Sequence, residues 1–204
     1  MKLYGCAKTR SDRVRWTLEE AGAAYEYVPV DLFNGGARTP AFLAINPQGK
    51  VPVLEVEGQY LTESAAMCRL VADRHPAAHL IPAPGTVARA RCEQWCDFAI
   101  SELEQPLWSI SKHRFALPPD KRVAAMLDTA AWEFARAAGM LATGLGGNTW
   151  ILGDTFSVAD VLLGHTLAWA HACKLELVAP NVQAYAQRVL ARPALQRVRE
   201  LNAA

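Results

Sequence analysis

The chain has 204 residues, 21 of them Lys or Arg and 20 Asp or Glu, so its formal net charge of +1 does not indicate nucleic acid or an anionic membrane surface as a partner. Hydrophobic residues make up 51% of the chain and charged residues 20%, which is typical of a globular protein and not of a disordered one. No apolar run approaches the ~20 residues that cross a membrane, and the start of the chain is too short and polar for a signal peptide.

The first 75 residues alternate between short strands and helices. Strands are expected at 2–5, 25–30, 53–56 and 60–61, and helices at 11–22, from 39 and at 64–74. The order is β-α-β-α-β-β-α, in which the strand–helix–strand unit requires a parallel pair and the final hairpin adds antiparallel strands. Pro29 within the second strand predicts an edge position.

Residues 76–85 carry three prolines and no periodicity, which predicts a linker. Everything after this segment has a helical pattern, with helices expected at 86–115, 120–145, 157–173, 182–190 and from 193. We therefore expect an N-terminal domain at 1–75 and an all-helical domain at 86–204. Asp160 follows Ser157 by three residues, as in a capping box, so we interpret it as a folding element and not as a catalytic acid.

Two short segments of the N-terminal domain predict a site for a small charged peptide. Val51-Pro52 lies directly before an apolar strand, and an X–Pro bond can be cis at modest cost. A cis bond there would turn the main chain of Val51 outward, where it could pair with a peptide-like ligand. Glu63-Ser64 lies at an expected helix N-terminus, where free N–H groups favour a carboxylate.

The segments Asn46–Leu54 and Thr62–Ser64, with the later motif Gly153–Asp160, resemble those of glutathione S-transferases. The resemblance runs along nearly the whole chain. It implies a thioredoxin-like α/β N-terminal domain followed by an all-α domain, and a cytoplasmic homodimeric detoxification enzyme. Glutathione would be the co-substrate and a hydrophobic electrophile the second substrate. The five cysteines lack the spacing of a disulfide framework, and reduced intracellular thiols are the simplest interpretation.

Glutathione conjugation requires a thiolate, whereas a free thiol has a pKa near ~8.5. A hydroxyl that donates a hydrogen bond to the sulfur lowers that pKa. The segment from Ala7 resembles the family pattern S-x-x-x-R-V, and counting back four residues from Arg13 gives Thr9 as the first candidate. Ser11 is the second candidate and Cys6 a distant third. Either hydroxyl could instead simply cap the first helix.

The resemblance also implies which residues hold glutathione. Lys50 would meet the glycyl carboxylate, and Val51, before Pro52, would bind through its main chain. Glu63 would accept from the γ-glutamyl ammonium, and Ser64 would donate to the carboxylate of the same residue. Two further residues, Asn34 and Arg38, could also reach the glycyl carboxylate.

Aromatic side chains in the helical domain could form an apolar wall for the second substrate. Trp108 and Phe115 are the candidates, with Trp95 beside them, although packing between helices is the better interpretation for any one of them. Arg13 and Arg15 could clamp an anion, but a solvated or dimer-facing role is the favoured interpretation. No metal site is expected, because no further ligand stands near Cys92 and Cys96.

Two alternatives to a transferase remain open from the sequence. Some relatives use glutathione to isomerise double bonds or to reduce peroxides, and a serine-type loop permits either reaction. Alternatively, the chain could be a non-catalytic glutathione-binding or regulatory protein, since fold alone does not decide function. No phosphate-binding or nucleophile-elbow motif is present.

Overall fold

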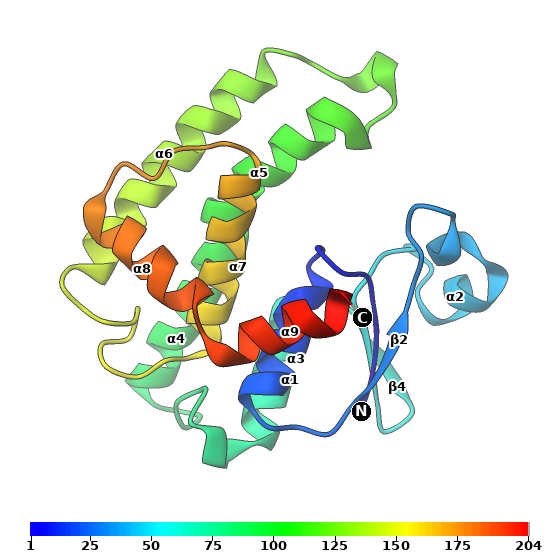
Figure 1. The fold of residues 1–204 in the computed structure, drawn as a ribbon, viewed down its shortest axis with the longest axis horizontal. Coiled ribbons are helices and arrows are strands. Elements are labelled where there is room, and N and C mark those ends of the chain that lie inside the picture. The colour runs from blue at the N-terminus through cyan, green and yellow to red at the C-terminus, as the bar shows by residue number, and fades with distance from the viewer. Residues whose placement is uncertain (204) are drawn as a thin grey trace. The chain divides into compact units, whose positions relative to one another are not determined.

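The computed structural model describes residues 1–203, which divide into two compact units (Figure 1). The first unit consists of residues 1–81 and 192–203, and the second of residues 82–191. The elements of the first unit are β1 (Lys2–Gly5), α1 (Ser11–Glu20), β2 (Glu26–Pro29), α2 (Pro40–Ile45), β3 (Val53–Val56), β4 (Gln59–Leu61), α3 (Ser64–Arg74) and α9 (Pro193–Ala203).

The four strands form one mixed sheet in the order β2-β1-β3-β4. β1 pairs parallel with β2 and antiparallel with β3, and β3 pairs antiparallel with β4. The predicted β-α-β-α-β-β-α order is confirmed. Pro29 lies in β2 at one edge of the sheet, where its missing N–H disrupts no ladder on the open side.

Both faces of the sheet are covered. On one face Val30, Ala37, Phe42 and Val53 form a buried cluster, with Tyr4 packed against it. Leu3 and Leu54 are fully buried and, because side chains alternate along a strand, lie on the opposite face with α1 and α3. Thr39 caps α2 by accepting the N–H of Phe42, so this short helix starts where the sequence places it.

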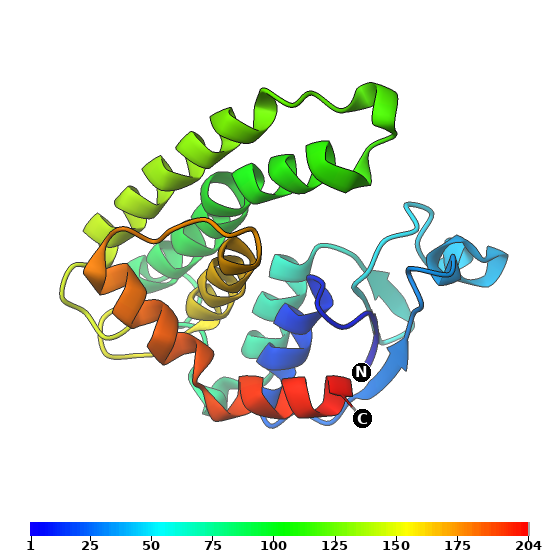
Figure 2. The same ribbon diagram turned by 45° about the horizontal axis from the view of Figure 1, so that its top comes forward.

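The last helix, α9, packs against α1 and belongs to the first unit (Figures 1 and 2). Arg192 forms a two-pronged ion pair with Glu20 at 2.6 and 2.7 Å, and Arg197 pairs with Glu19 at 3.1 Å. The sequence placed residues 86–204 in one helical domain, whereas the structure groups 192–203 with the sheet. Ion pairs between residues more than 170 positions apart leave no local pattern to detect.

The second unit is helical throughout its regular parts, with α4 (Val87–Phe98), α5 (Glu104–Ser111), α6 (Met126–Leu145), α7 (Val158–Ala172) and α8 (Pro180–Leu190). A π-helical turn, Ala99–Leu103, joins α4 to α5 within the run predicted as one helix. Pro106 explains this turn, because its ring would clash with the carbonyl four residues earlier in a regular α-helix.

The buried helix α7 begins at the predicted capping box. Asp160 is fully buried, and its carboxylate accepts both the N–H and the hydroxyl of Ser157. It also accepts the N–H of Ile151 and the hydroxyl of Tyr185. Four hydrogen bonds thus join α7, α8 and the preceding loop at one carboxylate. Among residues 1–203, no helix combines the length and apolar character that crossing a bilayer requires.

Candidate functional site

The loop between β1 and α1 holds two hydroxyl groups against each other. The Thr9 hydroxyl lies 2.7 Å from the carbonyl oxygen of Cys6 and 2.9 Å from Oγ of Ser11, and it accepts the N–H of Ser11 at 3.1 Å. Oγ of Ser11 accepts the N–H of Cys6 at 3.1 Å. All these groups are satisfied when Thr9 donates to the Cys6 carbonyl and Ser11 donates to Thr9.

The two hydroxyls differ in their access to a ligand. Ser11 is 1% exposed, and a Cβ on Gly5 would lie 2.9 Å from its Cβ, so the serine fills the space at the end of β1. Thr9 is only half-buried. A ligand sulfur could therefore replace the Cys6 carbonyl as acceptor of the Thr9 proton, whereas the Ser11 hydroxyl is enclosed. The geometry favours Thr9 over Ser11, and Cys6 itself is half-buried beside them.

Arg13, four residues after Thr9, connects this loop to the start of α3. Its guanidinium lies 3.5 Å from Oγ of Ser64, and the side chain is 1% exposed. Arg15 is also buried, with its guanidinium 4.1 Å from the centre of the Tyr27 ring. Of the expected solvated or dimer-facing role for these arginines, the solvated one is wrong, because α1 buries residues on nearly its whole circumference, and the dimer-facing one stays a prediction. A buried guanidinium therefore lies beside the first residue of α3.

Glu63 and Ser64 form the start of α3, as the sequence predicts. Ser64 is the first helical residue and is 6% exposed, whereas Glu63 is exposed. Glu63 adopts φ 68°, a left-handed conformation that residues with a side chain rarely take. Such backbone strain concentrates at functional sites. The two side chains therefore present a carboxylate and a hydroxyl beside the free N–H groups of a helix N-terminus.

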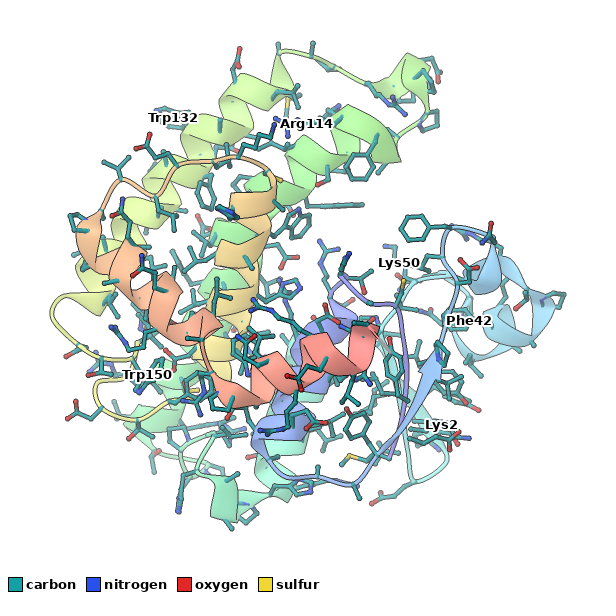
Figure 3. All side chains as sticks on the ribbon, viewed as in Figure 1. Lys2, Phe42, Lys50, Arg114, Trp132 and Trp150 are labelled. Atoms are coloured by element: carbon teal, nitrogen blue, oxygen red, sulfur yellow. The ribbon has the colours of Figure 1, made fainter. Side chains whose placement is uncertain are left out.

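The loop before β3 is organised around Asn46, which is 3% exposed. Its amide donates to the carbonyl of Lys50 at 2.7 Å and accepts the N–H of Gln48 at 3.1 Å. The main-chain carbonyl of Asn46 accepts the N–H of Gly49 at 2.9 Å. Lys50 is exposed at the end of this turn (Figure 3). The buried asparagine thus holds the segment that delivers Lys50 to the surface.

Arg38 lies along the same loop. One guanidinium nitrogen donates to the carbonyl of Gln48 at 3.4 Å, and a Cβ on Gly49 would lie 2.7 Å from that nitrogen. The structure therefore brings Arg38 and Lys50 to one segment, which gives this part of the surface two cations. The Val51–Pro52 bond that follows is cis, and β3 begins only at Val53, so the main chain of Val51 lies outside the sheet.

Asn34 is separately engaged. Its amide donates to the Asp31 carboxylate at 2.6 Å, and this hydrogen bond lowers the pKa of Asp31. The N–H groups of Phe33 and Asn34 donate to the other carboxylate oxygen at 3.1 Å each. The asparagine therefore closes a turn at an exposed aspartate, which is a structural use of its side chain.

The aromatic candidates lie in the second unit. Trp108 is half-buried on α5, and Phe115 is 68% exposed in the turn that follows it. Trp95 stacks edge-to-face with Phe98 at 5.1 Å, and a Cβ on Gly144 of α6 would lie 2.1 Å from the Trp95 ring. Trp95 therefore packs between helices, whereas Phe115 presents apolar surface to solvent.

Metal ligation finds no support within the described residues, where no group of three His, Cys, Asp or Glu side chains has a suitable arrangement. Cys92 and Cys96 are both fully buried on α4, and hydrogen bonding from Cys96 lowers the pKa of the Cys92 thiol. Burial raises the pKa of the Cys68 thiol, on α3, to about 11. These cysteines are packing residues.

Comparison with known proteins identifies the family of this chain. Residues 9–74 match the family described as glutathione S-transferase, N-terminal domain, and residues 105–193 match glutathione S-transferase, C-terminal domain. Glutathione S-transferase 3 of Zea mays is 30% identical over 97% of this chain and 92% of its own length. The first match covers the loop of Thr9, the turn of Lys50 and the start of α3.

Solved structures of whole chains show the same fold. The bacterial transferase BphK, in a ternary complex, has a TM-score of 0.89 at 31% identity and covers 100% of both chains. A sphingomonad glutathione S-transferase complexed with glutathione has a TM-score of 0.86 at 32% identity, over 100% of this chain and 99% of its own. This chain belongs to the glutathione S-transferase family.

Proposed function

We propose that the protein is a glutathione transferase that binds glutathione in the first unit and transfers it to a hydrophobic electrophile. The observation that carries the proposal is the arrangement around Arg13. This buried guanidinium contacts Ser64 at the start of α3 and lies four residues after Thr9, whose hydroxyl is in the loop before α1. An anion-binding helix end and a thiol-directed hydroxyl are the two requirements of glutathione activation.

The tripeptide is proposed to lie across three segments of the first unit. Arg38 and Lys50 attract the glycyl carboxylate. Asn34, four residues before Arg38, donates to the same carboxylate once its side-chain amide has left the Asp31 carboxylate. The main chain at Val51 and Pro52 pairs with the cysteinyl residue as an added strand does. Glu63 and Ser64 hold the ammonium and the carboxylate of the γ-glutamyl residue.

The thiol is proposed to ionise against Thr9. When glutathione binds, the Thr9 hydroxyl turns from the Cys6 carbonyl to the sulfur, and this hydrogen bond stabilises the thiolate and lowers the thiol pKa. The released proton goes to solvent. The thiolate then forms a carbon–sulfur bond as the leaving group departs with the electrons of its own bond, or, with an unsaturated carbonyl, as the carbanion takes a proton from water.

The second substrate is proposed to be apolar, since Trp108 and Phe115 offer aromatic surface in the second unit. We also propose a cytoplasmic homodimer, in keeping with the family. Sedimentation of the purified protein tests pairing directly, and a panel of aryl halides, epoxides and unsaturated carbonyls tests the electrophile.

The deciding experiment follows the ultraviolet absorbance of the thiolate of bound glutathione from pH 5 to 9. A thiolate that appears well below pH ~8.5 supports an activated nucleophile. Binding with an unshifted thiol would favour a carrier or regulatory protein. Turnover of a double bond or a peroxide without conjugation would favour an isomerase or a peroxidase. Failure to bind glutathione would contradict the proposed peptide site.

A further inference from the structure

Helix α9 is hydrogen-bonded to the residue that fixes the loop before α1. The Asn202 amide donates to Oδ1 of Asp12 at 3.1 Å, and its carbonyl oxygen accepts from the Arg15 guanidinium at 2.5 Å. Oδ2 of Asp12 accepts the N–H of Lys8 at 2.9 Å. One amide thus bridges a buried cation and the carboxylate that holds the Thr9 loop.

We propose that Asn202 and Asp12 are positioning residues, through which α9 sets the geometry of the thiol-activating loop. The catalytic part of this inference rests on the proposed function, whereas the structural coupling does not. Neither side chain is among the groups proposed to touch glutathione. They act through Lys8 and Thr9.

The loop needs such a support because its backbone is strained at one point. Lys8 has φ 61°, in the left-handed region that is costly for a residue with a side chain. The hydrogen bond from its N–H to Asp12 holds this conformation in place. On the next residue, the Thr9 carbonyl accepts the N–H of Asp12 at 3.1 Å. Asp12 therefore binds the loop twice, at the N–H of the strained residue Lys8 and at the carbonyl of Thr9, the residue that carries the functional hydroxyl.

Asp12 is in turn oriented by α9. Oδ2 of Asp12 accepts from the loop and Oδ1 accepts from Asn202, so removal of the Asn202 amide would take away the hydrogen bond to Oδ1 at a partly buried interface. Burial raises the pKa of Asp12, and the bond from Asn202 is the largest opposing influence. Arg15 fixes the direction of the Asn202 amide, and the Tyr25 hydroxyl, 3.2 Å from the arginine, anchors Arg15. The bridge therefore favours the charged carboxylate against the effect of burial, and it directs Oδ2 toward Lys8.

The test compares Asn202→Ala with Arg197→Ala. Arg197 also joins α9 to α1, through Glu19, but it lies at the far end of α1 from the loop. Amide hydrogen exchange of residues 6–11 is measured in the ligand-free proteins. The pKa of the bound glutathione thiol, kcat and KM are then measured with glutathione. Asn202→Gln, which keeps the amide, serves as the conservative variant.

We expect Asn202→Ala to speed exchange at Lys8 and to raise the thiol pKa by roughly one unit. The turnover number should fall, up to roughly 100-fold, with little change in KM for glutathione, because the hydroxyl is displaced while the ligand-holding groups remain. Asn202→Gln should recover part of both effects. Arg197→Ala should lower thermal stability without moving Lys8 exchange or the thiol pKa.

Equal Lys8 exchange in Asn202→Ala, Arg197→Ala and the unchanged protein would overturn the coupling. Faster exchange with an unshifted thiol pKa would overturn the catalytic part of the inference. If the unchanged protein forms no bound thiolate, the proposed function fails, and the exchange data still decide whether α9 holds the loop.

Discussion

The hydroxyl of Thr9 lies 2.7 Å from the carbonyl oxygen of Cys6, in a loop where the neighbouring Ser11 hydroxyl is enclosed. The Thr9 proton thus has an acceptor within the loop that a sulfur would have to replace. On the proposed function, we expect this competition to reduce the stabilisation that the hydroxyl gives to a thiolate. If Thr9 is the thiol-activating donor, as we propose, its hydroxyl must first exchange the Cys6 carbonyl for the sulfur.

Replacing Thr9 with Val removes the hydroxyl and keeps the shape of the side chain. We expect glutathione to bind, the pKa of its thiol to return toward ~8.5, and kcat/KM at pH 6.5 to fall by at least about 100-fold. Thr9→Ser should retain activity. Thiolate absorbance and steady-state kinetics measure both variants.

The control is Ser11→Ala, which removes a structural hydroxyl and leaves the Cys6 N–H without its acceptor. We expect it to lower the free energy of unfolding by about 1–3 kcal/mol while the folded protein keeps an ionised thiol. A silent Thr9→Val beside an inactive Ser11→Ala would reverse the assignment of the two residues.

Arg13 should contribute to glutathione affinity through Ser64. Arg13→Lys keeps a positive charge but loses the planar fork, so the contact with Ser64 weakens. We expect the dissociation constant for glutathione to rise about tenfold, which corresponds to ~1.4 kcal/mol. Calorimetric titration measures the change, with the exposed Arg74→Lys as control. An unchanged dissociation constant would remove Arg13 from the binding site.

Gly49 is required by both space and backbone conformation. Its φ is 61°, and an added Cβ would lie 2.7 Å from the Arg38 guanidinium and 2.8 Å from the carbonyl oxygen of Ala37. We expect Gly49→Ala to lower the free energy of unfolding by more than the ~1–2 kcal/mol that the left-handed conformation alone costs. Glutathione binding should weaken with it, because the turn carries Lys50.

Gly58→Ala is the matched control for Gly49→Ala. Gly58 has φ 71° in the β3–β4 turn, and no atom lies within 4 Å of its added Cβ. It should show the conformational cost alone. Equal denaturant midpoints for the two variants would mean that the Arg38 side chain moves away from the added Cβ with no loss in the free energy of unfolding.

Two glycines of α6 should respond in opposite directions to the same substitution. A Cβ on Gly144 would lie 2.1 and 2.2 Å from ring atoms of Trp95, whereas no atom lies within 4 Å of one on Gly139. Gly144→Ala should destabilise by about 1–3 kcal/mol through overpacking. Gly139→Ala should stabilise by up to ~1 kcal/mol through helix propensity. Thermal unfolding compares them, and a neutral Gly144→Ala would show that Trp95 moves freely.

Asp160 should be the most sensitive polar residue of the second unit. Asp160→Asn replaces one acceptor oxygen by a donor that would face the hydroxyl or N–H groups now bound there. We expect a loss of about 3 kcal/mol in the free energy of unfolding at pH 7. The exposed neighbour Asp154→Asn should change little.

The unchanged protein and Asp160→Asn should also differ in how their stability depends on pH. Burial raises the pKa of Asp160 above its unfolded value, so the folded state binds the proton more tightly. The contribution of the protonated Asp160 to the free energy of unfolding is complete below the unfolded pKa of 3.8. It is lost as the pH rises through the pKa of Asp160 in the folded state. The stability difference between the unchanged protein and Asp160→Asn should therefore narrow from acid toward neutral pH. A difference that widens would show that the four hydrogen bonds outweigh burial.

Much of the fold was predictable because its signals are local. Pro29 marks an edge strand, Thr39 caps α2, and Ser157 with Asp160 starts α7, each within a few residues. The burial of Arg13 was not predictable, since its partner Ser64 is 51 positions away. The sequence does indicate that the Thr9 hydroxyl can bond within its own loop, because Cys6 is only three residues away. It does not indicate which of the several acceptors in the loop is used, and the structure shows that it is the Cys6 carbonyl.

The return of α9 to the first unit has a consequence for the protein as it is made. The 110 residues of the second unit, 82–191, are translated between the two parts of the first. Arg192 follows Glu20 by 172 residues and Asn202 follows Arg15 by 187, so at roughly 5–20 residues per second α1 is synthesised about 9–37 s before these partners. Until then Glu20 and Arg15 lack these partners. The nascent sheet unit should accordingly be protease-sensitive and gain its full resistance only when the last helix emerges.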